Sequence, residues 1–114
     1  MGVKNILILG IGKVGWHLAQ RLVQEGHSVT VIESDPNLTA SANETLDARV
    51  VLGSAMEYSK WAEARTEQID LIIAVTDNDA LNMIACLIAD KFQIPQKIAR
   101  IRSLDFGSDA PLLA

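Results

Sequence analysis

Three glycines stand between an apolar run and a stretch of helical periodicity in residues 7–20, LILGIGKVGWHLAQ. Gly10, Gly12 and Gly15 follow the spacing G-x-G-x-x-G. Each glycine costs backbone entropy on folding, so three at one strand-to-helix junction indicate that another group comes very close to this main chain. The pattern predicts a strand, a tight turn and a helix packed closely on that strand.

Strand and helix patterns alternate along the rest of the chain. Apolar or β-branched runs predict five strands, at residues 6–9, 28–33, 49–52, 69–75 and 97–102. The stretches between them predict four helices, at residues 14–24, 36–46, 57–65 and within 76–92. We expect Asp77 or Asp79 to cap the last helix. Its inner face is expected to carry four apolar side chains, Leu81, Ile84, Leu87 and Ile88.

The glycine spacing is that of a dinucleotide-binding loop. In such a loop the first glycine allows the turn, the second lets the main chain approach a pyrophosphate, and the third lets helix and strand pack closely. The helix that begins near Lys13 adds free N–H groups and the positive end of its dipole. Glu33 follows Gly15 by eighteen residues, where its carboxylate can accept hydrogen bonds from both ribose hydroxyls and repel a 2′-phosphate. No arginine lies between Gly26 and Leu46, so the pattern favours NAD or NADH over NADP.

Alternating strands and helices predict a parallel sheet, because right-handed crossovers place each helix over a face of the sheet. The expected fold is α/β, a Rossmann-like doubly wound parallel sheet of about five strands in the order 3-2-1-4-5, with helices on both faces. Ligands of such sheets lie beyond the carboxyl ends of the strands, here at the switch between the first and fourth strands. We expect residues 1–104 to form one nucleotide-binding domain and residues 105–114 to be a tail or linker.

Composition and charge exclude several classes of protein. With 114 residues, 49% of them apolar, the chain can form one domain with a core. Its net charge of -4 argues against a nucleic-acid-binding surface. Cys86 is the single cysteine, and there is no signal peptide or apolar run of about 18 residues, so we expect a cytosolic protein that does not insert into the membrane. His17 and His27 lack partners at metal-ligand spacing, so no metal site is predicted.

Five segments together resemble one known family. They are, in order along the chain, ILGIGKVG, VTVIESDP, VVLGSA, LIIAVTDNDALNMIAC and IPQKIARIRS. Their order and spacing closely resemble the nucleotide-binding domain of the Trk/Ktr potassium-uptake regulators, also called the TrkA-N or RCK N-terminal domain. The resemblance covers nearly the whole chain. The stretch from Ala74 to Asn82, followed by IARIR, is more diagnostic than the glycine loop, because few other Rossmann domains share it.

The resemblance and the motif together imply a set of cofactor-binding residues. These are Gly10, Ile11, Gly12, Lys13, Val14, Gly15, Glu33, Ser34, Gly53, Ser54, Ala55, Thr76, Asp79, Asn82 and Arg100. One position departs from the family pattern: many members have Gly-Asp-Ala after the third strand, with the Asp near the adenine amine, where this chain has Gly53-Ser54-Ala55. Serine is shorter and uncharged. The resemblance therefore leaves ATP or ADP open as an alternative to NAD or NADH.

The function that the resemblance implies is regulatory. It is that of a nucleotide-sensing domain, acting as a homodimer or a higher ring, that controls a membrane potassium transporter or channel subunit. Such a domain is cytoplasmic and peripheral at the inner face of the membrane through its transporter. The alternative is the cofactor-binding fragment of an NAD-dependent oxidoreductase. We expect no enzyme, because the sequence supplies no substrate domain, and Tyr58 and Lys60 do not have the Tyr-x-x-x-Lys spacing of the short-chain reductases.

Overall fold

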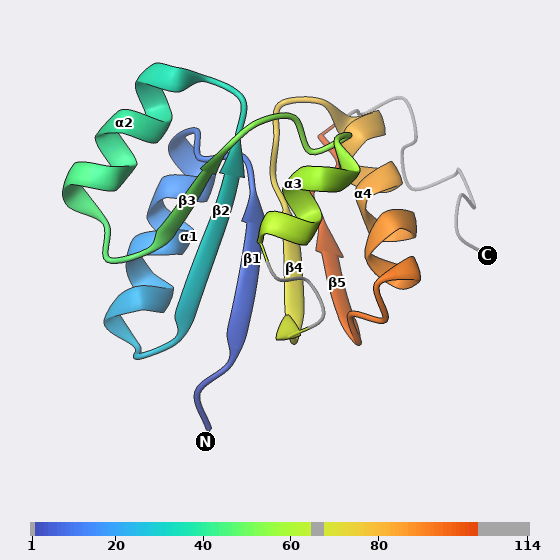
Figure 1. The fold of residues 1–114 in the computed structure, drawn as a ribbon, viewed down its shortest axis with the longest axis horizontal. Coiled ribbons are helices and arrows are strands. Elements are labelled where there is room, and N and C mark those ends of the chain that lie inside the picture. The colour runs from blue at the N-terminus through green and yellow to red at the C-terminus, as the bar shows by residue number, and fades with distance from the viewer. Residues whose placement is uncertain (1, 65–67, 103–114) are drawn as a thin grey trace.

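One parallel sheet forms the centre of the computed structural model, which describes residues 2–64 and 68–102. Its strands are β1 (Asn5–Leu9), β2 (Ser28–Glu33), β3 (Arg49–Leu52), β4 (Leu71–Ala74) and β5 (Gln96–Ala99). They pair in the order β3-β2-β1-β4-β5, and all pairs are parallel (Figure 1). The predicted α/β fold and strand order are confirmed.

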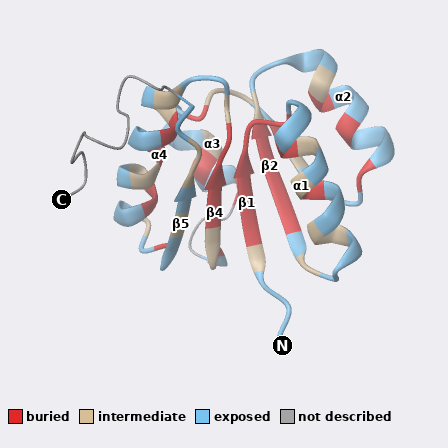
Figure 2. Cartoon of the chain, turned by 180° about the vertical axis from the view of Figure 1, so that it is seen from behind, coloured by how far each residue is buried: buried red, intermediate tan, exposed pale blue. Residues whose placement is uncertain are grey.

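Helices cover both faces of this sheet. They are α1 (Lys13–Gln24), α2 (Pro36–Thr45), α3 (Tyr58–Glu63) and α4 (Asp79–Lys91). Figure 2 shows α1 and α2 on one face, and Figure 1 shows α3 and α4 on the other. Alternate residues of β1 therefore enter different cores: Ile6 and Ile8 pack on the α1 side, and Leu7 and Leu9 pack on the α3 side. Within the described residues, no helix has the length and apolar content to span a bilayer.

Strand and helix ends differ from the predicted ranges. Strand β4 is shorter than residues 69–75, and β5 ends at Ala99 instead of continuing to Arg102. After β5, the N–H of Arg100 still donates to Ala74 O at 3.0 Å, and the chain then leaves the ladder at the carboxyl edge of the sheet. Helix α3 ends at Glu63, and the predicted end at residue 65 lies outside the described residues, as does the predicted tail at 105–114.

The predicted cap of α4 was wrong. Neither Asp77 nor Asp79 caps this helix; Asn78 is the N-cap, and its Oδ1 accepts a hydrogen bond from Leu81 N at 2.9 Å. Three residues with capping side chains follow one another here, and only the one with extended backbone just before the first turn can reach the free N–H groups.

The predicted inner face of α4 was also partly wrong. The residues buried against the sheet are Asn82, Ala85 and Ala89, with Leu81 and Ile88 only partly buried. Two residues expected to point inward are exposed, and these are Ile84 and Leu87, at 39% and 72% exposure. Two alanines allow the helix axis to approach the sheet closely, so the larger apolar side chains are left at the sides of the contact.

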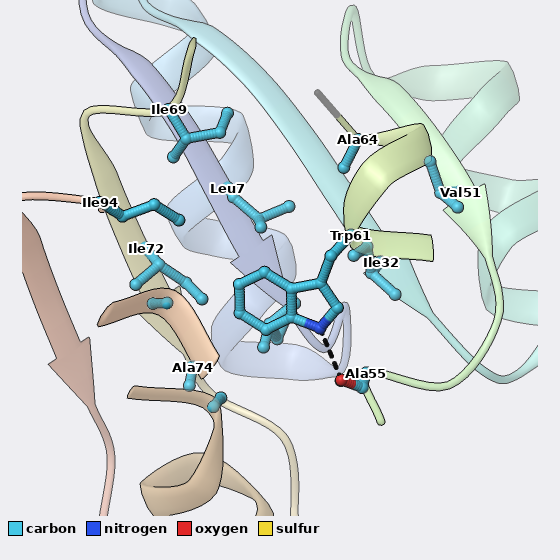
Figure 3. Close-up of a cluster of buried hydrophobic side chains, with 13 residues drawn as sticks. Leu7, Ile32, Val51, Ala55, Trp61, Ala64, Ile69, Ile72, Ala74 and Ile94 are labelled. Atoms are coloured by element: carbon cyan, nitrogen blue, oxygen red, sulfur yellow. Dashed lines mark hydrogen bonds between the residues drawn. The ribbon is translucent and has the colours of Figure 1, made fainter. Parts of the chain in front are cut away.

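Trp61 anchors α3 in the core (Figure 3). Its side chain is fully buried among residues such as Leu7 and Ile72, and its ring stacks on Phe92 with the ring centroids 5.7 Å apart. The indole Nε1 donates to Ala55 O at 2.7 Å (Figure 3). One side chain therefore fills the core and also fixes the loop that follows β3.

We predict that Trp61→Ala lowers the free energy of unfolding by about 3–5 kcal/mol, because it leaves a large cavity and an unpaired buried carbonyl. Trp61→Phe keeps most of the ring but loses the hydrogen bond to Ala55, and about 1–2 kcal/mol is expected. Chemical denaturation monitored by circular dichroism measures both. A loss below about 1 kcal/mol in Trp61→Ala would contradict the packing described here.

Candidate functional site

A cavity of about 530 Å³ lies at the carboxyl edge of the sheet, where the topology predicts a ligand crevice. The loops after β1, β2, β3 and β4 and the residues that follow β5 line it. Strand order explains the position, because β1 and β4 lie side by side while their connections cross to opposite faces.

Eleven of the fifteen predicted site residues line this cavity. They are Gly10, Gly12, Lys13, Val14, Glu33, Ser34, Gly53, Ser54, Ala55, Thr76 and Arg100. The other four lie near the cavity but do not line it, and they are Ile11, Gly15, Asp79 and Asn82. Seven lining residues were not among the predicted site residues: Ile32, Asp35, Leu38, Val75, Asp77, Leu81 and Arg102. Most of these adjoin a predicted residue at a strand end or lie in the first turn of a helix, which is the sequence signal that could have found them.

The three glycines of the loop differ in what a Cβ atom at each position would contact. Gly10 has φ +95°, and a Cβ atom there would lie 2.9 Å from the Cα of Thr76. At Gly15 a Cβ atom would lie 2.0 Å from Gly10 O, so this glycine permits the close packing of α1 on β1. At Gly12 no atom lies within 4 Å of the Cβ position. Of these three positions, Gly12 is therefore the one at which a Cβ atom would meet no atom of the protein.

The N-terminus of α1 has no side-chain cap. Its N-cap residue is Gly12, which has no side chain to accept a hydrogen bond, and the first turn contains no acidic residue. The other two described helices of more than eight residues are capped, α2 by Asp35 and α4 by Asn78. Gly12, Lys13 and Val14 line the cavity, so the free N–H groups and the positive dipole end of α1 lie at its wall.

Glu33 connects the end of β2 to the glycine loop. Its Oε1 accepts a hydrogen bond from Ile11 N at 2.7 Å, and its Oε2 accepts one from Asp35 N at 2.9 Å. The N–H of Ile11 is thereby used within the protein, and the residue is buried and does not line the cavity. A carboxylate has about four acceptor positions, so Glu33 keeps acceptor capacity on the side of the cavity.

Asn82 joins the loops at the other end of the cavity. Its side chain is fully buried, and its amide nitrogen donates to Thr76 O at 3.1 Å and to Arg100 O at 2.9 Å. Its Oδ1 accepts from both the N–H and the hydroxyl of Thr76. The side chain is thus satisfied within the protein, and Asn82 positions the cavity wall without forming part of it. Asp79 also bonds within the protein, its Oδ1 accepting a hydrogen bond from Arg102 N at 3.1 Å.

Charge is unevenly distributed along the cavity. Glu33 and Asp35 lie at the end of β2, whereas Arg100 and Arg102 lie at the opposite end, together with the carboxylate Asp77. The Arg100 side chain donates to Val75 O and Thr76 O, and the Arg102 side chain donates to Asp77 O. Within residues 2–64 and 68–102 neither arginine forms an ion pair with a carboxylate, and Nε of Arg100 is buried without a hydrogen-bond partner.

Cys86 lies on α4, outside the lining of the cavity. It is half-buried, and burial raises the pKa of its thiol, an effect that the charge of Lys97 partly opposes. A raised pKa keeps the thiol protonated and poorly nucleophilic at neutral pH. In the part of the chain that the structure describes, no group of three His, Cys, Asp or Glu side chains is placed to hold a metal ion.

Curated relatives are potassium-uptake proteins. The chain is 40% identical over 111 residues to the Trk system potassium uptake protein TrkA of Halomonas elongata, covering 96% of this chain and 24% of that protein. It is 37% identical over 100 residues to the Trk system potassium uptake protein TrkA homolog of Methanothermobacter thermautotrophicus, covering 88% and 46%. The chain therefore spans less than half the length of these relatives.

A solved structure and a family model agree with these relatives. The structure described as the GsuK channel bound to NAD superposes with a TM-score of 0.71 at 26% identity, covering 83% of this chain and 17% of that one. The model of the TrkA-N domain matches residues 6–110, which is nearly the whole chain. The resemblance noted in the sequence is confirmed, and the chain belongs to the TrkA-N domain family.

Proposed function

We propose that this TrkA-N domain binds an adenine dinucleotide, NAD or NADH, as a regulatory ligand of a potassium-uptake system. The observation that carries the proposal is the uncapped N-terminus of α1 at the wall of the cavity. A helix end without a cap leaves N–H groups free for an anion, and Gly12 lets the pyrophosphate approach the main chain without meeting a side chain.

The residues next to this helix end fit the adenosine half of the ligand. Glu33 lies at the end of β2, directly beside β1, and its remaining lone pairs can accept hydrogen bonds from the two ribose hydroxyls. A phosphate on the 2′ oxygen would meet this carboxylate. The cationic residues of the cavity lining are Lys13, Arg100 and Arg102, none of which comes from the β2–α2 segment that would face a 2′-phosphate.

A second candidate ligand is ATP or ADP. Arg100 and Arg102 carry charges that no carboxylate of the described residues neutralises in an ion pair, and Lys13 lies in the glycine loop. These three cations favour a chain of phosphates beyond the adenosine. The dinucleotide remains the first candidate because Glu33 follows the dinucleotide fingerprint at the expected distance.

The proposed ligand acts as a signal and is not consumed. TrkA-N domains are a regulatory family and not an enzyme family. A bound nucleotide would contact loops that follow four strands. If the nucleotide binds one arrangement of the domain more tightly than another, it shifts the equilibrium toward that arrangement. We propose that the domain acts as a homodimer or higher ring on a membrane potassium transporter or channel subunit, at the cytoplasmic face of the membrane. The potassium-uptake relatives and the NAD-bound channel structure support this role.

Calorimetric titration tests the ligand. We predict that NADH or NAD binds, and that NADPH binds at least about tenfold more weakly because its 2′-phosphate meets Glu33. Glu33→Ala is expected to weaken NADH binding and to reduce the preference over NADPH. Parallel titrations with ATP and ADP test the second candidate. Equal affinities for NADH and NADPH in the unaltered protein would contradict the proposal that Glu33 discriminates against a 2′-phosphate.

Two glycine variants separate folding from binding. Gly12→Ala is expected to cost about 1 kcal/mol of stability or less, because its Cβ meets no protein atom, yet to weaken NADH binding at least about tenfold by meeting the pyrophosphate. Gly15→Ala is the matched control: its Cβ would lie 2.0 Å from Gly10 O, so we expect a large fall in the melting temperature. Thermal denaturation and titration of both variants measure the two effects. Unchanged NADH affinity in folded Gly12→Ala would place the diphosphate elsewhere.

A further inference from the structure

Helix α4 carries apolar side chains on the side that faces away from the sheet. Met83, Ile84 and Leu87 are 41%, 39% and 72% exposed, and Ala80 is also exposed. Relative to Ala80 the other three follow at spacings of three, four and seven residues, which place all four in one line along a helix. Figure 2 shows the exposed side of α4 turned away from the sheet. We call these four residues the α4 stripe.

The other two described helices of more than eight residues have polar outer sides. After its first turn, the exposed residues of α1 are His17, Gln20, Arg21 and Gln24. The exposed residues of α2 beyond its first turn are polar except Ala40. A line of large apolar side chains in contact with solvent is therefore particular to α4 among these three helices. Such a line favours a contact with the apolar side of another helix.

Charges of opposite sign stand at the two ends of the α4 stripe. Lys91 lies one turn beyond the stripe and Asp77 lies just before it, and both are exposed. Within residues 2–64 and 68–102 neither of them forms an ion pair. Nearby charged groups bond within the chain: Asp90 pairs with Lys97 at 3.4 Å, and the Arg102 side chain donates to the main-chain oxygen of Asp77. One cation and one carboxylate are thus available to a partner, at opposite ends of the apolar line.

A second copy of α4 fits the α4 stripe when the two helices run antiparallel. In a twofold pair each contact occurs twice, with the two copies exchanged. With the twofold axis between Met83 and Ile84, Leu87 of one copy lies opposite Ala80 of the other, and Met83 lies opposite Ile84. The most exposed large side chain of the stripe therefore meets the smallest one.

We propose that α4 is a self-association surface, at which two copies of this chain pair through antiparallel α4 stripes with Lys91 of each copy beside Asp77 of the other. The antiparallel register brings opposite charges together, whereas a parallel pair would place like charges side by side. The inference rests on the proposed function only where that function requires a homodimer or higher ring. Asp77 also lines the cavity, so this charge pair would join the interface to the arginine end of the nucleotide site.

Sedimentation velocity of the full 114-residue chain tests the surface. The stripe is narrow compared with a standard interface of about 800 Å² per partner, so we expect a weak dimer with a dissociation constant of about 10 µM to 1 mM. Leu87→Glu is expected to weaken this dimer at least about tenfold, because it places a carboxylate in the apolar contact. Val3→Glu is the matched control: Val3 is 71% exposed and lies outside the helices and strands, so the dimer should not change.

Reversal of the two charges tests the register. Lys91→Glu or Asp77→Lys replaces two attractive contacts of the twofold pair by two repulsive ones, so each is expected to weaken the dimer about tenfold. The variant with both changes restores opposite charges, and its dissociation constant should lie within about threefold of that of the unaltered chain. A double variant that dimerises no better than the single ones would overturn the proposed pairing. Circular dichroism melting verifies that all variants are folded.

The remaining outcomes separate this inference from the proposed ligand. A chain that stays monomeric up to about 1 mM, for example because residues 103–114 occupy the stripe instead, would overturn the inference. A dimer that Leu87→Glu leaves intact would overturn it too. NADH titration of the same samples measures the ligand independently. A monomer that binds NADH would contradict the pairing alone, and a dimer that binds no nucleotide would contradict the ligand alone.

Discussion

The close contact between Gly15 and the carbonyl oxygen of Gly10 sets the distance between α1 and β1. A methyl group at Gly15 would lie 2.0 Å from that oxygen, so every other residue would force the helix away from the strand. The approach places the first turn of α1 at the carboxyl edge of the sheet, where its free N–H groups reach the cavity. Gly10 packs closely on the main chain of Thr76, and this contact fixes the position of the loop after β4 relative to the loop after β1. These two contacts bring the loops after β1 and β4 together at the cavity.

Polar side chains fix the remaining loops, and each has a distinct set of partners. Glu33 ties the glycine loop to the start of α2, and Asn82 ties the loop after β4 to the residue that follows β5. Trp61 fixes the loop after β3 by donating a hydrogen bond from its indole to the carbonyl oxygen of Ala55. A ligand in the cavity would therefore meet loops that the protein already holds in place, which would reduce the entropy lost on binding.

Much of this arrangement could be predicted from the sequence, because it depends on periodicity and on glycine spacing. Alternating patterns predict a parallel sheet, the dinucleotide fingerprint favours the order 3-2-1-4-5, and this order determines which loops meet. The wrong predictions concern segments in which several neighbouring residues have similar preferences for capping a helix, for burial or for a strand. Asn78 stands between two aspartates that also cap helices well, and backbone geometry decides among them. The apolar residues of α4, Leu87 among them, cover more than one face of the helix. The sequence pattern does not show which face is buried, and in the structure Ala85 and Ala89 pack against the sheet. Arg102 follows a β-like stretch that bends out of the sheet after Ala99, so its place at the cavity depends on the end of β5.

The acidic net charge of the chain and the binding of an anionic ligand are compatible because charge is organised locally. The net charge is -4, yet the end of α1 and Lys13 line the cavity at the position proposed for the diphosphate, and Arg100 and Arg102 line its far end. Of the three carboxylates that line the cavity, Glu33 and Asp35 lie at the end of β2 and Asp77 lies at the arginine end, and the proposed binding mode places Glu33 at the ribose, where it would accept hydrogen bonds. A Debye length of about 8–10 Å screens more distant surface carboxylates, so the groups within the cavity dominate the energy of the bound ligand. In the proposed binding mode, the same separation would place a phosphate added at the 2′ position beside the carboxylates at the end of β2.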